Sequence, residues 1–154
     1  MRRSNKELVS EFVTRVDRSL KGQPADAAEL LSPDAVIQVI GSTPISGIYR
    51  GTREIMDILV RSAAGRIASG SVRLIDAIGQ GDRIGVFLLI RAKTHTGRTY
   101  NAQGDPAGCY FRLSGGKIEE IRFYPDTTQI EAEIYERRFV PNIASPRDAS
   151  GDLR

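Results

Sequence analysis

Residues 72–124 read VRLIDAIGQGDRIGVFLLIRAKTHTGRTYNAQGDPAGCYFRLSGGKIEEIRFY, and this stretch decides the fold. Its apolar residues recur with the two-residue period of β-strands, and short clusters rich in glycine interrupt them. The pattern predicts four strands, at residues 72–78, 83–93, 98–113 and 117–124. Because the turns between them are short, we expect neighbouring strands to pair antiparallel.

Helical patterns lie on both sides of these strands. Ser4 and Glu7 have the spacing of a capping box, and Leu8, Phe12 and Val16 follow at four-residue intervals, which predicts an amphipathic helix. The other expected elements are a short helix at 25–31, a strand at 35–40, a loop at 46–52, a helix that carries Ile55, Ile58 and Leu59 and ends at Gly65, and a last helix at 127–138. Helices first and consecutive strands later indicate an α+β fold with helices laid across one face of a bent sheet.

Length and composition fit one cytoplasmic domain. The 154 residues predict a single domain at 1–140, followed by a flexible tail at 141–154 that is rich in serine, aspartate, glycine and arginine. Cys109 is the only cysteine, which favours a reducing compartment. The net charge is +3, but basic residues are scattered among acidic ones, so we expect no nucleic-acid partner. No apolar run exceeds strand length, so we expect no membrane contact.

Three motifs resemble those of a known superfamily. They are Ser46-Gly47-x-x-x-Gly51, Gly97-Arg98-Thr99-Tyr100-Asn101, and the segment from Phe111-Arg112-Leu113 through Gly116-Lys117-Ile118 to Tyr124-x-Asp126. Together they resemble the nuclear transport factor 2-like superfamily, in its SnoaL-like cyclase, ketosteroid isomerase-like and limonene epoxide hydrolase-like branches. The resemblance implies a cone, in which a curved mixed or antiparallel sheet of the cystatin-like α+β barrel kind wraps around the N-terminal helices. It also implies a pocket at the open end and a homodimer formed through the outer sheet face.

The resemblance to ketosteroid isomerases implies positions for three catalytic groups. The general base falls at Gln38 or Val39, the tyrosine at Phe12 and the second acid at Cys109. A glutamine takes up no proton at neutral pH, a phenylalanine has no hydroxyl, and a buried thiol is a weak hydrogen-bond donor. The isomerase set is therefore expected to be missing.

The epoxide hydrolase pattern also lacks its catalytic groups. Its arginine and two aspartates fall at Phe87, Leu89 and Phe123, which are all apolar. Residues 87 and 89 share one face of their strand because strand side chains alternate. On this alignment the polar floor of the pocket is replaced by an apolar one.

A few polar residues remain as candidates for chemistry. Asp126 closes the last strand as in the family pattern, but Gln129 follows at the spacing of an N-cap, and we favour the structural role. His95 lies beside a turn and is interpreted as a surface residue. Asn101 shares a face with Cys109 only if no bulge interrupts the glycine-rich stretch between them. One histidine and one cysteine do not make a zinc site, and we expect no metal and no cofactor.

The favoured hypothesis is a pocket that binds a small apolar molecule, such as a polycyclic, terpenoid or polyketide-like metabolite. The residues expected to contact it are Phe12, Val16, Gln38, Tyr49, Ile55, Leu59, Phe87, Leu89, Asn101, Cys109, Phe111 and Phe123. One alternative is an isomerase or cyclase that uses Asp126 as its acid–base group, with Tyr49 or Asn101 polarising a carbonyl group. Another is an interaction module without a ligand.

Overall fold

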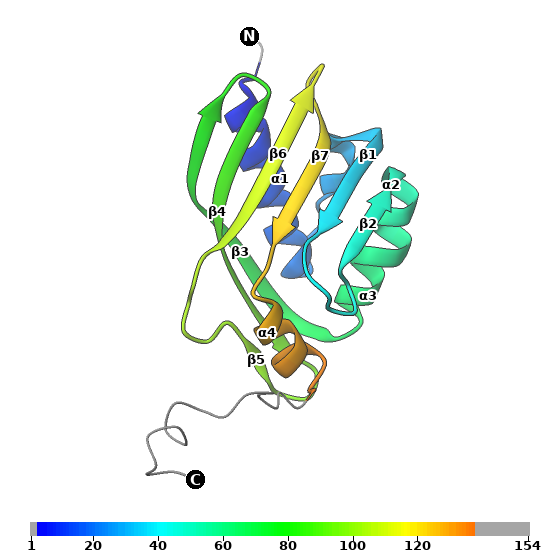
Figure 1. The fold of residues 1–154 in the computed structure, drawn as a ribbon, viewed down its shortest axis with the longest axis vertical. Helices are drawn as coiled ribbons and strands as arrows, with labels where there is room; N and C mark the ends of the chain where they lie inside the picture. The colour runs from blue at the N-terminus through cyan, green and yellow to red at the C-terminus, as the bar shows by residue number, and fades with distance from the viewer. Residues whose placement is uncertain (1–2, 138–154) are drawn as a thin grey trace, which may run out of the picture.

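A bent sheet forms the body of the protein, and helix α1 crosses its inner face (Figure 1). The computed structural model describes residues 3–137. In chain order the elements are α1 (Asn5–Leu20), the 3₁₀ turn η1 (Ala27–Leu30), β1 (Leu31–Val39), β2 (Gly47–Arg50), α2 (Gly51–Glu54), the π-helical η2 (Ile55–Val60), α3 (Arg61–Ala64), β3 (Ile67–Gln80), β4 (Arg83–Thr94), β5 (Thr99–Tyr100), β6 (Ala107–Ser114), β7 (Lys117–Tyr124), α4 (Thr127–Gln129) and the π-helical η3 (Ile130–Ile134). Segments α2, η2 and α3 follow one another without a break, and we name them helix 51–64. No helix among residues 3–137 combines the length and the apolar character needed to cross a membrane.

The strands lie in the order β2-β1-β7-β6-β4-β3, and the short β5 pairs with β4. Strands β1 and β7 are parallel, whereas every other neighbouring pair is antiparallel. Strands β1 and β7 end together, where α4 begins (Figure 1). The α+β class and the curved mixed sheet expected from the sequence are confirmed.

Helix α1 begins at the predicted capping box. The Ser4 hydroxyl accepts a hydrogen bond from the Glu7 N–H at 3.1 Å, and the Glu7 carboxylate accepts one from the Ser4 N–H at 2.8 Å. These bonds satisfy two backbone donors that a helix start leaves free. The apolar face of the helix then buries Leu8, Val9 and Val13 against the sheet.

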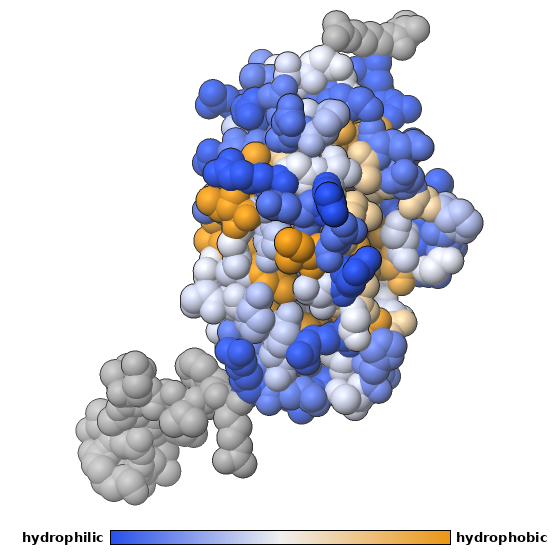
Figure 2. Space-filling view, turned by 90° about the vertical axis from the view of Figure 1, so that its right-hand side faces the viewer, coloured by the Kyte–Doolittle hydropathy of each residue, from blue (hydrophilic) through white to orange (hydrophobic). Residues whose placement is uncertain are grey.

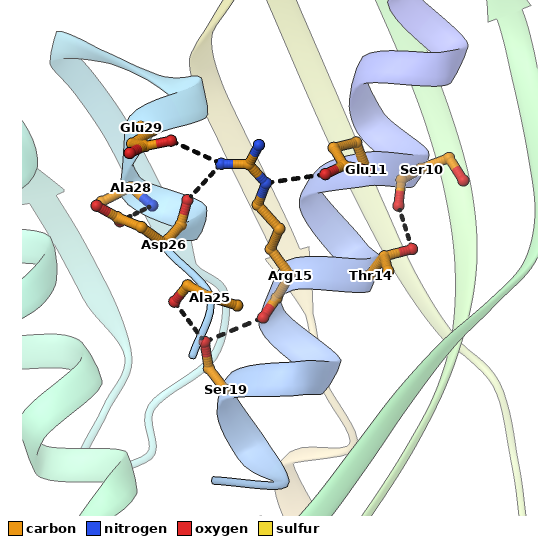
Figure 3. Close-up of polar contacts among 9 residues, drawn as sticks. All are labelled: Ser10, Glu11, Thr14, Arg15, Ser19, Ala25, Asp26, Ala28 and Glu29. Atoms are coloured by element: carbon orange, nitrogen blue, oxygen red, sulfur yellow. Dashed lines mark hydrogen bonds and ion pairs between the residues drawn. The ribbon is translucent and has the colours of Figure 1, made fainter. Parts of the chain in front are cut away.

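An arginine holds α1 against η1, as Figure 3 shows. The guanidinium of Arg15 donates to the Glu11 carboxylate at 2.9 Å, to the Glu29 carboxylate at 2.9 Å and to the Asp26 carbonyl oxygen at 2.8 Å. The hydrogen bond from Arg15 lowers the pKa of Glu11 below its ordinary value. This contact ties the helix to the segment that leads into β1, and it therefore sets how α1 lies across the sheet.

The sheet and α1 enclose one main apolar core. The ring of Phe12 meets the ring of Phe111 edge-to-face, with centroids 5.9 Å apart, and Phe111 is almost fully buried. The buried members are Leu8, Val9, Val13, Leu31, Ala35, Ile37, Val39, Ile55, Val72, Ile84, Val86, Leu88, Cys109, Phe111, Leu113, Ile118 and Ile121. A smaller cluster joins Ala92 of β4, Tyr100 of β5 and Ile130 of η3.

Three elements differ from the sequence predictions. The strand expected at 98–113 is interrupted by a turn, because Asn101 adopts a positive φ of 59° and starts an irregular segment that lasts until β6. The loop expected at 46–52 contains β2, which pairs with β1. The last helix ends at Ile134 instead of residue 138. The tail at 141–154 lies outside the described residues.

Candidate functional site

The register of the sheet defines which side chains face α1. Cys109 lies opposite Val86 on one side and Phe123 on the other, and Phe123 lies opposite Val39 on β1. Side chains of directly opposed residues share one face of a sheet. Since Val86, Cys109 and Val39 belong to the buried core, this is the inner face, and Phe123 lies on it as well.

Three predicted contact residues lie on the opposite side of the sheet. Phe87 and Leu89 alternate with the buried Val86 and Leu88, so both lie on the outer face, and Phe87 is 45% exposed. Gln38 alternates in the same way with Ile37 and Val39, which are buried on the inner face. The structure therefore does not bring these three residues to the inner face, and their contact with a ligand stays a prediction. The two apolar residues do share a face, as alternation requires, but it is the outer one.

Other predicted residues do gather on the inner side. Phe111, Ile55 and Cys109 are buried there, whereas five of their predicted neighbours are only half-buried against the same core. These five are Phe12 and Val16 from α1, Tyr49 from β2, Leu59 from helix 51–64 and Phe123 from β7. A half-buried apolar side chain keeps surface that a bound molecule can cover. We call these five residues the inner wall.

Tyr49 is the polar member of the inner wall. Its hydroxyl donates a hydrogen bond to the Ile45 carbonyl oxygen at 2.7 Å. Burial, together with the nearby Tyr135, raises the pKa of Tyr49 above its ordinary value. The phenol therefore stays neutral around pH 7 and can accept a further hydrogen bond from a ligand. Tyr135 directly follows η3, and no sequence pattern connects it with Tyr49.

Cys109 has low reactivity on this face. Burial raises the pKa of its thiol to about 12. A thiol that stays protonated at neutral pH is a poor nucleophile. The residue fills the inner face between Val86 and Phe123 as a small apolar side chain.

Asp126 has the geometry of a helix cap. Its carboxylate accepts a hydrogen bond from the Gln129 N–H at 3.1 Å, which is the N-cap contact expected from the sequence. The side chain is exposed and belongs to the loop between β7 and α4. Burial raises the pKa of Tyr100, and the charge of Asp126 contributes in the same direction.

Asn101 is buried, and its side chain joins the turn that follows β5 to β4. Its amide nitrogen donates to the carbonyl oxygens of Ile90 and Asp105, each at 2.8 Å, and its amide oxygen accepts from the Asp105 N–H at 2.9 Å. These bonds use both ends of the side-chain amide. Gln103 and Asp105 are exposed, and His95 is exposed beside its turn as expected.

Four surface hollows lie away from the inner wall. The largest, of about 750 Å³, lies between the start of α1 and the turn after β6. Two more, of about 540 and 300 Å³, lie along β3, and the fourth, of about 260 Å³, lies on the outer face of β1. The walls of these four contain none of the five inner-wall residues. Sequence patterns gave no sign of any of them, because each joins segments that are distant along the chain.

The curved sheet, the crossing helix and the apolar inner face define a nuclear transport factor 2-like α+β cone. A family model described as a SnoaL-like domain matches residues 9–121. The chain therefore belongs to the SnoaL-like domain family.

Solved structures share this fold at low sequence identity. A nuclear transport factor 2-like protein of unknown function from Burkholderia pseudomallei K96243 is 20% identical, with a TM-score of 0.70 over 86% of this chain and 98% of its own. TerC, co-crystallised with polyporic acid, is 18% identical, with a TM-score of 0.65 over 83% and 95%. A putative polyketide cyclase from Sinorhizobium meliloti is 15% identical, with a TM-score of 0.55 over 75% and 92%. No curated protein matches the chain in sequence at a significant level.

Proposed function

We propose that this protein binds a small apolar molecule of the polyketide or terpenoid kind at its inner wall. The ligand would lie between α1, helix 51–64 and the inner sheet face, with Tyr49 as the polar group that orients it. This proposal rests on one observation about the inner face. Its apolar side chains are partly exposed, and its titratable groups, the Tyr49 hydroxyl and the Cys109 thiol, remain neutral around pH 7. None of the five inner-wall residues carries a carboxylate or an imidazole group.

The fold neighbours support this ligand class. One of them was crystallised with polyporic acid, and another is described as a putative polyketide cyclase. Helix 51–64 supports it as well, because its central segment is π-helical, and π-helical turns occur frequently at functional sites. Since Ile55 packs into the core on this segment, a ligand would enter by shifting helix 51–64 outward.

Two neighbouring residues of β7 provide a matched test. Phe123 is half-buried on the inner face, whereas Tyr124 is 48% exposed on the outer face. The chain has no tryptophan, so Phe123→Trp and Tyr124→Trp each introduce a single fluorescent reporter. We expect polyporic acid, or another aromatic polyketide or terpenoid compound from a panel, to change the fluorescence of the Phe123→Trp protein saturably.

The Tyr124→Trp protein controls for light absorption by a coloured ligand, because absorption alone dims both reporters equally. Equal changes in the two variants for every compound would contradict binding at the inner wall. A second check is Val16→Trp, which replaces one inner-wall residue by a bulkier side chain and is expected to reduce the ligand-induced rise in melting temperature.

A further inference from the structure

Three positively charged side chains, Arg73, Arg91 and Lys93, lie on the outer face of the β3–β4 hairpin. The register places Ser71 opposite Arg91, and Ser69 opposite Lys93. Arg73 lies two residues beyond Ser71 on the same face, so its position is diagonal to Arg91, a spacing of about 7–8 Å between neighbours in a sheet. Lys93 is two residues from Arg91 along β4, a separation of about 7 Å. Arg73 is 18 and 20 positions away from Arg91 and Lys93 in sequence, which is why these basic residues look scattered in the sequence.

These three cations lack anionic partners among residues 3–137. No ion pair or side-chain hydrogen bond in that part of the chain involves Arg73, Arg91 or Lys93, although the structure pairs many other arginines. Asp76 is the one acidic residue on β3 and β4, and its carboxylate accepts a hydrogen bond from the Ala77 N–H at 2.9 Å. The face therefore carries uncompensated positive charge.

Two hollows meet at this cluster. The hollow of about 540 Å³ includes Ser71, Arg73 and Arg91 and continues along α1 to Asp17, whose carboxylate is already bonded to Lys21 and to the Val72 N–H. The hollow of about 300 Å³ includes Ser69, Ser71, Arg91, Lys93 and Thr99. Arg91 and Ser71 belong to both walls. Hydroxyl groups thus lie beside the cations and can donate further hydrogen bonds to an anion.

The turn after β5 lies against Arg91. A Cβ atom built on Gly104 would lie 2.6 Å from the Nη2 atom of Arg91, so the guanidinium lies close to the backbone of that turn. The side chain of Asn101 fastens this turn to β4 through the Ile90 carbonyl oxygen. The turn therefore restricts the space open to the guanidinium, and a side chain that is restricted before binding loses less freedom when it takes up an oxyanion.

We propose that this face is a phosphate-binding site, formed by Arg73, Arg91 and Lys93 with Ser71, for a small molecule that carries a phosphate or diphosphate group. Three positive charges match a group of two to three negative charges, and the forked guanidinium of Arg91 suits two phosphate oxygens at once. The four residues lie on the outer face of the sheet, at the β3 edge beside α1, and the site does not depend on the function proposed for the inner wall.

Calorimetric titration with pyrophosphate and with inorganic phosphate tests the proposal, at an ionic strength kept constant with sodium chloride. We expect saturable binding, tighter for pyrophosphate, and a loss of about tenfold or more in affinity for Arg91→Gln. Arg73→Gln is expected to weaken binding in the same direction. Both positions are exposed, and circular dichroism of each variant checks that it folds.

Arg83→Gln is the matched control, because Arg83 is an exposed arginine on the same face of β4 but at its far end. Its affinity for pyrophosphate should equal that of the unchanged protein. The proposal is overturned if pyrophosphate gives no heat beyond that of sodium chloride, or if all three variants bind alike. A single-stranded oligonucleotide that binds when pyrophosphate does not would also overturn it, in favour of a nucleic-acid surface.

Discussion

The alternative function, a cyclase or isomerase, depends on a single carboxylate, that of Asp126. The structure uses this group as the N-cap of α4. Asparagine caps helices about as well as aspartate, whereas replacement by alanine costs about 1 kcal/mol. We therefore expect Asp126→Asn to leave the free energy of unfolding nearly unchanged and Asp126→Ala to lower it by about 1 kcal/mol, as measured by urea denaturation.

The same pair of variants tests the acid–base alternative. If an aromatic polyketide substrate is found, a capping residue predicts equal turnover in the Asp126→Asn protein and the unchanged one. Loss of turnover in Asp126→Asn at an unchanged urea midpoint would instead assign catalysis to this residue.

The thiol of Cys109 makes stability depend on alkaline pH. Its pKa is raised from 9.0 to about 12 by burial, so the folded state retains a proton that the unfolded state releases. This contribution is fully present below pH 9 and is lost as the pH rises towards 12. We expect the urea midpoint to fall over this range more steeply for the unchanged protein than for Cys109→Ala, which removes the thiol but keeps the tyrosines and lysines. Parallel curves for the two proteins would contradict this.

At the scale of an element, the β3–β4 hairpin depends on one glycine. Gly79 has a φ of 123°, and a Cβ atom there would overlap the carbonyl oxygen of Arg83. Gly79→Ala is expected to destabilise the protein by more than about 1 kcal/mol in thermal or urea unfolding. Gly85, in the same hairpin, has open space around a built Cβ, with the nearest atom at 3.9 Å. Gly85→Ala should be neutral or slightly stabilising, and an equal loss in both variants would rule out this explanation.

Element types were largely predictable from the sequence, but the facing of one strand was not. The capping box, the hairpin turns and the strand at 117–124 follow from local chemistry and appear as expected. Strand β4 reads IGVFLLI at 84–90, so its apolar run has no alternation to indicate an inner face. Only pairing with β6, which places Cys109 opposite Val86, decides that Phe87 faces outward.

The details of the turn after β5 could not be predicted from the local sequence either. Gly104 and Pro106 indicate an irregularity, but the break depends on Asn101, whose side chain reaches the Ile90 carbonyl oxygen on β4. Such a contact requires the strands to be already placed. For the same reason the three cations of the outer face could not be grouped from the sequence.

At the scale of the whole molecule, the outer sheet face has exposed apolar residues in a row. Phe87 and Tyr124 lie on either side of Gly108, and a Cβ built on Gly108 would meet no atom within 4 Å. Two exposed aromatic rings therefore border an open gap one strand wide. We propose that a second copy of the chain packs on this row and forms a homodimer.

Light scattering coupled to size-exclusion chromatography checks the dimer. We expect a mass of twice 16.9 kDa for the unchanged protein and a shift towards 16.9 kDa for Phe87→Asp. Ile58→Asp is the control, because Ile58 is also an exposed apolar residue but lies on helix 51–64, where Figure 2 shows apolar side chains at the surface. A monomer at all concentrations, or equal loss in both variants, would argue against the proposed interface.

The place of β7 in the sheet has a consequence for how the chain is made. Among residues 3–137 this strand comes last along the chain, yet it lies between β1 and β6 and is paired with both. While the ribosome has not yet released residues 117–124, β1 with β2 has no partner on that side, and the β3–β4–β6 sheet has an open edge. Unpaired edges attract other chains, so we expect the nascent protein to be prone to aggregation until β7 emerges.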